Sequence, residues 1–195
     1  ISKKERSFSE TPFIVTHYAK IMIDEHHKHN VLTAIKHFPG HGSTAIDTHE
    51  KVANVSHSWS QKELLPYKSL INDNKVDVIM TSHVFNRRVD PKFPASLSRK
   101  HIYEQLRQHL NYNGVVISDD LKMLAIRQHF SLEETIINTI NASTDILLFG
   151  NISTKDNTVP LTIASKIQTA INNGSIPISQ IDSAFNRIMS LKQRL

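Results

Sequence analysis

Four short apolar runs, each followed by a segment with helical spacing, constrain the fold of this chain more than any other feature. The runs cover residues 31–37, 76–80, 115–117 and 145–149. Runs of this length that are rich in β-branched residues are typical of buried strands. Because helical segments separate them, we expect a parallel sheet covered by helices, which is an α/β fold.

Helix start signals support this alternation. Two Ser-x-x-Glu patterns, Ser60 with Glu63 and Ser131 with Glu134, predict capping boxes at the first turns of two helices. Apolar residues of the first helix are expected to share one face: Phe13, Ile14, Ala19, Ile21 and Met22. Further helix starts are expected at Thr11-Pro12, Ser98, Pro160 and Ser179.

Polar and titratable residues stand at the carboxyl ends of three of the four runs, at residues 36–37, 81–83 and 118–120. This arrangement is typical of a (β/α) barrel, whose active site lies on the carboxyl rim of its strands. An open doubly wound sheet is the alternative, but it usually carries a G-x-G-x-x-G loop, which is absent here. A complete barrel has eight strands in about 250 residues, so four strands predict half a barrel.

Composition narrows the class of protein. The chain has 195 residues, of which 39% are hydrophobic, and we interpret residues 1–195 as a single catalytic-barrel domain. Its net charge is +5, but the cations are scattered, so no nucleic-acid partner is expected. No apolar stretch is long enough to predict a membrane span. The absence of cysteine excludes disulfides and thiolate chemistry, and it fits a cytoplasmic location.

The first residue is Ile1 rather than Met, and no signal-like segment follows it. We therefore expect an N-terminally incomplete domain.

The polar loop after the first run holds the densest group of chemically useful residues. Pro39, Gly40 and Gly42 predict a turn, and Asp47 and His49 follow it two residues apart. A strand that ends in such a loop is typical of the mouth of an active site, although local pattern alone fits an ordinary loop equally well.

The stretch from Lys36 to Gly42, with Thr44, Asp47 and His49 downstream, resembles the signature of bacterial β-N-acetylhexosaminidases of glycoside hydrolase family 3. Three further stretches resemble the same family in the same order: residues 5–8, residues 80–83 followed by 94–98, and residues 117–123. One position departs from the pattern, because Ser43 stands where the family often has Asp.

The resemblance implies a (β/α)8 TIM-type barrel of which about the last four β/α units are present. It implies Asp119 as the catalytic nucleophile and His49 as the acid/base, with Asp47 bonded to its imidazole. Asp120 is expected to orient its neighbours or to cap the helix that follows. The resemblance also implies that Arg6, Lys36 and His37 bind substrate. Met123 is a further candidate for substrate binding and His83 for lining the pocket, although Met123 fits a core position equally well.

The histidines at 37, 41 and 49 suggest zinc as an alternative, as does the cluster at residues 26–29, but the Asp47–His49 pair already explains the loop. We therefore expect no metal and no cofactor.

The function that this resemblance implies is retaining exo-hydrolysis of terminal β-linked N-acetylglucosamine, with peptidoglycan-derived glycans or muropeptides as the carbohydrate partner. A phosphorylase that uses the same covalent mechanism is one alternative. The other is a non-catalytic half-barrel fragment, which would expose sheet edges and self-associate through the incomplete barrel. We expect weak or no activity from residues 1–195 alone.

Overall fold

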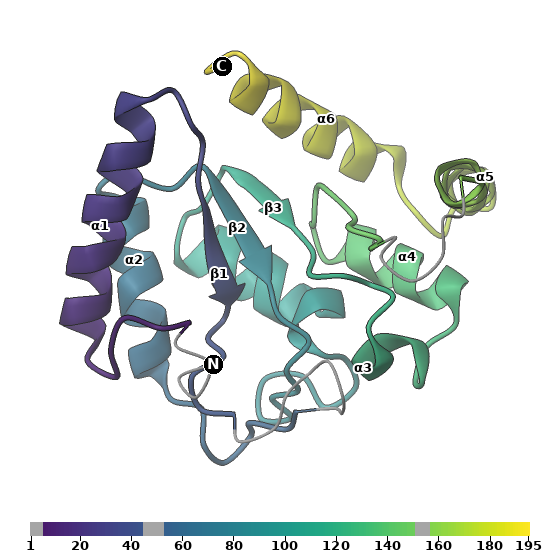
Figure 1. The fold of residues 1–195 in the computed structure, drawn as a ribbon. Coiled ribbons are helices and arrows are strands. Elements are labelled where there is room, and N and C mark those ends of the chain that lie inside the picture. The colour runs from purple at the N-terminus through teal and green to yellow at the C-terminus, as the bar shows by residue number, and fades with distance from the viewer. Residues whose placement is uncertain (1–5, 45–52, 151–156) are drawn as a thin grey trace.

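The computed structural model describes residues 6–44, 53–150 and 157–195, and within them the fold is α/β (Figure 1). The strands are β1 (Ala34–Phe38), β2 (Val78–Thr81) and β3 (Val115–Ile117). The α-helices are α1 (Pro12–Lys28), α2 (Leu65–Asn72), α3 (Leu124–Arg127), α4 (Leu132–Asn141), α5 (Val159–Asn172) and α6 (Ile178–Lys192). Two short 3₁₀ helices are η2 (Gln61–Leu64) and η3 (Ala95–Leu97), and η4 (Lys100–His109) is a π-helix.

The sheet is parallel, in the order β1-β2-β3, as the apolar runs predict. Ile35 pairs with Ile79, and Ile79 pairs with Val116, so the three strands are in register across the sheet. The predicted strand at residues 31–37 begins later, at Ala34, because the Val31 amide donates to the carbonyl of His26 at the end of α1.

The fourth predicted strand, at residues 145–149, is wrong as a regular strand. It runs beside β3 but forms only an isolated bridge, between Ile117 and Ile146. Side chains interrupt the ladder on both sides. The Asp145 carboxylate accepts the Val116 amide at 2.8 Å, and the Ser118 hydroxyl accepts the Leu148 amide at 2.9 Å.

One face of the sheet packs against helices. Phe38, Ile79 and Val116 lie in a core that α2 and η4 complete with Tyr67, Ile102 and Leu106. The other face is more open, since Ala34 and Lys36 are exposed and Met80 and Ile117 are only half-buried. A sheet covered by helices on one face, with the opposite face turned inward, is the wall of a TIM-type barrel.

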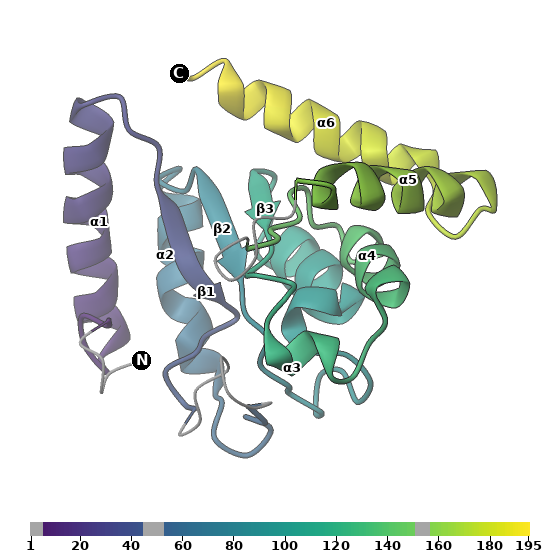
Figure 2. The same ribbon diagram turned by 45° about the vertical axis from the view of Figure 1, so that its right-hand side comes forward.

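Among the helices that follow β3, α6 lies at the amino ends of the strands, whereas α3 lies toward their carboxyl ends (Figure 1). α6 crosses above the amino ends in both views, and it contacts β3 (Figures 1 and 2). The carboxyl ends of the strands, where the sequence places the candidate site, point to the opposite edge of the sheet. No helix of the described residues is long and apolar enough to span a bilayer.

Several helix predictions need correction. Ser60 makes no side-chain cap, and a 3₁₀ turn precedes α2 in place of a capped helix start. The last helix begins at Ile178 after Pro177, so Ser179 lies inside it. In α1 the predicted apolar face is largely exposed, with Phe13 at 79%, and only Ile23 is buried.

The capping box predicted at Ser131 and Glu134 is confirmed, because the two residues bond each other reciprocally at the start of α4. Gly174 has φ +77°, which suits a glycine after the end of α5. Ile102 and Leu106 of η4 are fully buried.

Candidate active site

The carboxyl end of β1 brings a cation and an imidazole to the rim of the sheet. The pairing register shifts between Lys36 and Phe38, so His37 stands at an irregularity in the strand. The Lys36–His37 and Phe38–Pro39 peptide bonds are both cis. Phe38 is fully buried, whereas Lys36 is exposed. Phe38 therefore anchors β1 in the core, and Lys36 stays accessible on the other face of the strand.

His37 and Asp119 face each other across this rim. Their side chains approach to 3.8 Å between Nε2 and Oδ2, and they are 10% and 18% exposed. Burial lowers the pKa of His37 to about 4, against the attraction of the Asp119 carboxylate. His41, Lys36 and Arg6 add positive charge that lowers it further. The imidazole is therefore neutral near pH 7, and His37 and Asp119 do not form an ion pair.

The neutral His37 ring keeps unused hydrogen-bonding capacity. Its Nδ1 atom is buried and has no hydrogen-bond partner among the described residues. The His41 ring packs against it edge-on, with the centroids 5.6 Å apart. The ring thus turns Nε2 to the Asp119 carboxylate and keeps an unpaired Nδ1, which suits a hydroxyl group of a ligand.

Asp119 and Asp120 are adjacent in the sequence but have different surroundings. Asp120 accepts the backbone amides of Lys122 and Gly150 at 2.9 and 2.8 Å, so its carboxylate holds the turn after β3 against the segment that ends at Gly150. Asp119 accepts the Asp120 amide at 2.9 Å and keeps its other oxygen toward His37. The interpretation of Asp120 as an orienting residue agrees with these contacts.

His83 supports the turn after β3 that contains Asp119 and Asp120. It is fully buried, its Nε2 donates to the Asp120 carbonyl at 2.9 Å, and its Nδ1 accepts from the Ser96 hydroxyl at 2.7 Å. Burial lowers the pKa of His83, which keeps this tautomer neutral. His83 therefore does not line an open surface, in contrast to the sequence interpretation.

Met123 is the N-cap residue of α3 and is 8% exposed, and its amide donates to the Asp120 carbonyl at 3.0 Å. These contacts place Met123 in the support of the turn, and its expected contact with substrate stays a prediction.

Arg6 is exposed and close enough to His37 to disfavour its protonation. Asp47, His49 and the intervening Thr48 lie outside the described residues.

The structure thus brings His37 and Asp119 to face each other, with Lys36 next to His37 in β1. Among the described residues, no group of three or more His, Cys, Asp or Glu side chains is arranged to hold a metal ion. The expectation that the protein needs no metal stays a prediction.

Sequence reasoning missed two residues that hold the loop after β1. The Trp59 indole N–H donates to the Pro39 carbonyl at 3.1 Å, and the Glu63 carboxylate accepts from the Gly42 amide and the Ser43 hydroxyl. The Ser60-x-x-Glu63 pattern was the available signal, but it indicates a helix cap in place of this long-range contact.

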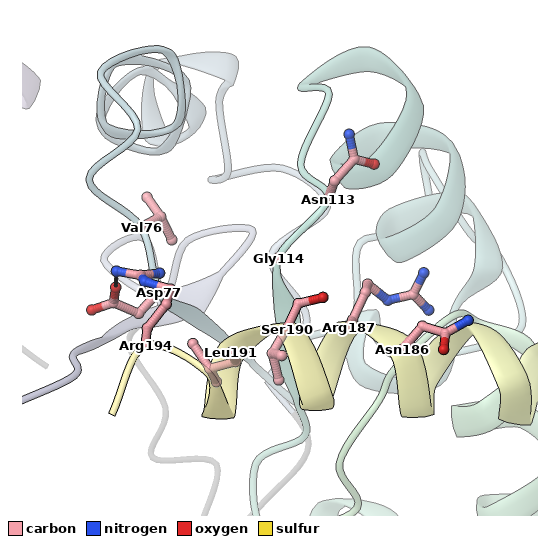
Figure 3. A pocket seen from close by; sticks show the side chains of 10 residues that line it. Val76, Asp77, Asn113, Gly114, Asn186, Arg187, Ser190, Leu191 and Arg194 are labelled. Carbon is pink, nitrogen blue, oxygen red and sulfur yellow. Dashed lines mark hydrogen bonds and ion pairs between the residues drawn. The ribbon is translucent and has the colours of Figure 1, made fainter.

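Two larger hollows lie away from these residues. A pocket of about 260 Å³ lies between α6 and the amino ends of β2 and β3, and Figure 3 shows Arg194 on its wall paired with Asp77. An open groove of about 790 Å³ runs between α1 and α2. In the first pocket both arginines, Arg187 and Arg194, are paired with buried carboxylates. The rim around Asp119 is therefore the better candidate site, because its polar groups retain capacity for a ligand.

A parallel β/α sheet with a carboxylate and neutral imidazole at its carboxyl rim defines a barrel-type enzyme site. The model of the glycosyl hydrolase family 3 N terminal domain matches residues 1–191, and the chain belongs to this family.

Relatives of known family are similar over most of the chain. Beta-hexosaminidase of Tolumonas auensis is 37% identical over 75% of this chain and 45% of its own length. Beta-hexosaminidase A of Pseudoalteromonas piscicida is 30% identical over 97% of this chain and 34% of its own length. The family 3 β-N-acetylglucosaminidase structure from Paenibacillus has a TM-score of 0.88 at 32% identity, covering 97% of this chain and 36% of that one. The chain therefore spans less than half the length of these relatives.

Proposed function

We propose that the protein is a retaining exo-glycosidase that releases terminal β-linked N-acetylglucosamine, with Asp119 as the nucleophile. The position of Asp119 carries this proposal. It lies two residues after the end of β3, its carboxylate is partly exposed at the carboxyl rim, and His37 faces it at 3.8 Å. Membership of family 3 and similarity to proteins named beta-hexosaminidase support the substrate class.

In the proposed reaction, an oxygen of Asp119 forms a bond to the anomeric carbon while the bond to the leaving oxygen breaks. His49 donates a proton to that oxygen. In the second step His49 takes a proton from water, the water oxygen bonds to the anomeric carbon, and the Asp119 carboxylate leaves. Two inversions give net retention of configuration.

A histidine suits the acid/base role because its ordinary pKa lies near neutrality. Asp47, two residues earlier, would accept the other ring N–H and fix the tautomer. Since the neutral base carries no charge, it also avoids the repulsion that a second carboxylate would exert on Asp119. This pair is supported by the sequence alone.

The charges of His37, Lys36 and Arg6 indicate how these residues would contact the sugar. The neutral His37 has an unpaired buried Nδ1 that suits a sugar hydroxyl, and Lys36 and Arg6 supply cations at the same edge. We assign these three residues to substrate binding. We extend the proposal to peptidoglycan-derived fragments and a cytoplasmic location, which rest on the sequence resemblance and composition.

A phosphorylase is the second candidate, because a neutral acid/base tolerates an anionic acceptor. The experiment that separates the two uses an aryl β-N-acetylglucosaminide with and without inorganic phosphate, with the products followed by proton NMR. Hydrolysis predicts β-N-acetylglucosamine as the first product at a rate independent of phosphate. A sugar 1-phosphate would favour the phosphorylase, and an α-configured first product would contradict the retaining mechanism.

A further inference from the structure

The two facing groups of the candidate site do not hold each other in place. Their closest atoms, His37 Nε2 and Asp119 Oδ2, are 3.8 Å apart, which is longer than a hydrogen bond, and the imidazole is neutral. Contacts elsewhere therefore fix the distance between them. In the sheet, β2 lies between β1, which contains His37, and β3, which Asp119 follows (Figure 1).

The two residues that come directly after β2 and Thr81 bond to both sides of the site. Ser82 donates its amide and its hydroxyl to the Phe38 carbonyl, at 2.8 and 3.0 Å. The next residue, His83, donates its Nε2–H to the Asp120 carbonyl at 2.9 Å. These two carbonyls belong to the residues that directly follow the two facing groups of the site. Consecutive residues of one segment thus hold the backbone beside both groups.

Ser96 completes this arrangement from the loop that precedes η4. Its hydroxyl donates to the His83 Nδ1 at 2.7 Å, and its amide donates to the Ser82 carbonyl at 2.9 Å. The first bond fixes the tautomer that carries its proton on Nε2, where the Asp120 carbonyl accepts it.

Ser82, His83 and Ser96 are all 0% exposed. Burial of three polar side chains is unfavourable unless each is hydrogen-bonded, and apolar residues would fill the same space without that requirement. Placement of the strand ends explains these residues better than packing alone.

We propose that Ser82 and His83 are positioning residues, which together hold the Asp119 carboxylate at the distance from His37 that attack on a bound sugar requires. Ser96 orients His83 within this bridge. A reacting group has to stay within about 0.5 Å of its productive position, and neighbouring residues with locked side chains provide that precision. The inference rests on the proposed function, since it takes Asp119 as the nucleophile and His37 as a sugar ligand.

The variant His83→Leu tests the inference, with His101→Leu as a matched control. Both histidines are fully buried, but the His101 Nδ1 bonds Gln105 within η4. Leucine is of similar size and makes no hydrogen bond, so the first variant breaks the bridge to the Asp120 carbonyl. The protein is a chain extended toward the length of the relatives, and the substrate is dinitrophenyl β-N-acetylglucosaminide.

Single-turnover release of dinitrophenolate measures the attack by Asp119, because this leaving group departs without protonation. We expect His83→Leu to lower the single-turnover rate constant by roughly 10²-fold and the affinity for substrate much less, because a shift of about 1 Å has effects of this size. His101→Leu should leave the rate constant unchanged. His83→Gln should keep most of the rate, since its amide both donates and accepts.

Ser96→Ala is a smaller change that tests the bridge even where His83→Leu does not fold. It removes the hydroxyl that orients His83, and we expect the rate constant to fall by about tenfold, which corresponds to one hydrogen bond. Ser98→Ala is its control, because Ser98 is equally buried but its hydroxyl bonds Asp90. The rate constant of Ser98→Ala should match that of the parent.

Crystal structures of the same variants give a readout that does not depend on activity. The distance between His37 Nε2 and Asp119 Oδ2 should increase in His83→Leu and Ser96→Ala and stay near 3.8 Å in the two controls. An unchanged distance, or an unchanged rate constant in the folded variants, would overturn the inference and leave the proposed glycosidase intact. Absence of glycosidase activity in the extended parent chain would overturn the proposed function, and the measured distances would still decide whether the bridge sets the geometry of the rim.

Discussion

The two ends of the sheet hold carboxylates in opposite situations. At the amino end, Asp145 bonds Arg107 at 2.8 Å and Arg187 at 2.9 Å, and it also accepts the Val116 amide. At the carboxyl end, Asp119 accepts one adjacent amide and faces a neutral imidazole at 3.8 Å. The side chain of Asp145 is 0% exposed and that of Asp119 is 18% exposed.

Asp77 extends the pattern of the amino end. It accepts the Thr33 amide and hydroxyl and the His27 imidazole, and it pairs with Arg194 near the end of the chain. Burial opposes its charge, but the hydrogen bonds from His27, Thr33 and Arg194 hold the pKa of Asp77 below its ordinary value. This carboxylate ties α1, β1 and the segment after α6 to the base of β2.

The comparison teaches how to distinguish structural charges from functional ones in this fold. A carboxylate whose partners all come from the protein stabilises the packing of elements, and it offers nothing to a ligand. A carboxylate that is held in place by one adjacent amide and faces a neutral imidazole is available for chemistry. The same substitution at the two ends should therefore have opposite consequences.

Asp119→Asn should have the largest effect on activity and little effect on folding. Loss of the nucleophile predicts a fall of about 10³-fold or more in kcat. Because Asp119 makes few contacts within the protein, the free energy of unfolding should change by less than about 1 kcal/mol. Steady-state kinetics of a chain extended toward the length of the relatives and urea denaturation measure the two quantities. Unfolding of this variant would contradict the expected difference between the two ends of the sheet.

Asp145→Asn should have the reverse effect. It leaves Arg107, whose side chain is 7% exposed, and Arg187 without their anionic partner. Breaking a buried pair in this way predicts a loss of about 3–5 kcal/mol in the free energy of unfolding. Urea denaturation of the two Asn variants side by side provides the measurement. Equal free energies of unfolding for the two variants would show that Asp145 does not stabilise the fold more than Asp119 does.

His37 predicts a pH-dependent contribution to stability at the carboxyl end. Its pKa is about 4 in the folded protein and 6.5 ordinarily, so the unfolded chain binds more protons between these values. Stability should therefore rise with pH from about 4 to 6.5, by on the order of 3 kcal/mol from this residue. Denaturation as a function of pH should show that His37→Gln reduces this rise. An unchanged profile would mean that His37 is not buried in its neutral form.

The smallest effect is expected from a residue remote from both ends. Glu134→Gln weakens the capping box of α4 and should cost about 0.5–1 kcal/mol in the free energy of unfolding, with kcat/KM unchanged. Denaturation and kinetics on the same preparation measure both. A change in kcat/KM here would contradict the expectation that the cap of α4 does not affect the site.

Much of the fold was predictable because local patterns encode it. The apolar runs at β2 and β3 and the Ser131 capping box depend on neighbouring residues only, and the structure confirms them. The fourth strand was not predictable in this way. Its ladder is interrupted by the Asp145 carboxylate, which bonds β3 and two arginines from distant helices.

The two Ser-x-x-Glu patterns show that local sequence rules also miss long-range contacts near the site. Ser131 and Glu134 bond each other, but the Glu63 carboxylate bonds Gly42 and Ser43, which no local rule reveals. The sequence predicted Asp119 and His37 as rim residues because they end strands. The support from His83 depends on a contact with Asp120, 37 positions later, which only the folded chain shows.

The most direct test of the central proposal is mass spectrometry of the protein after reaction with a 5-fluoro N-acetylglucosaminyl inactivator, which traps a glycosyl-enzyme ester. It should be applied to residues 1–195 and to a chain extended toward the length of the relatives. We predict a mass gain that maps to Asp119 in the extended chain and disappears in Asp119→Asn. Labelling of residues 1–195 as well would show that this part of the barrel binds the sugar alone. A label on a different carboxylate, or none in either chain, would contradict the assignment of Asp119 as the nucleophile.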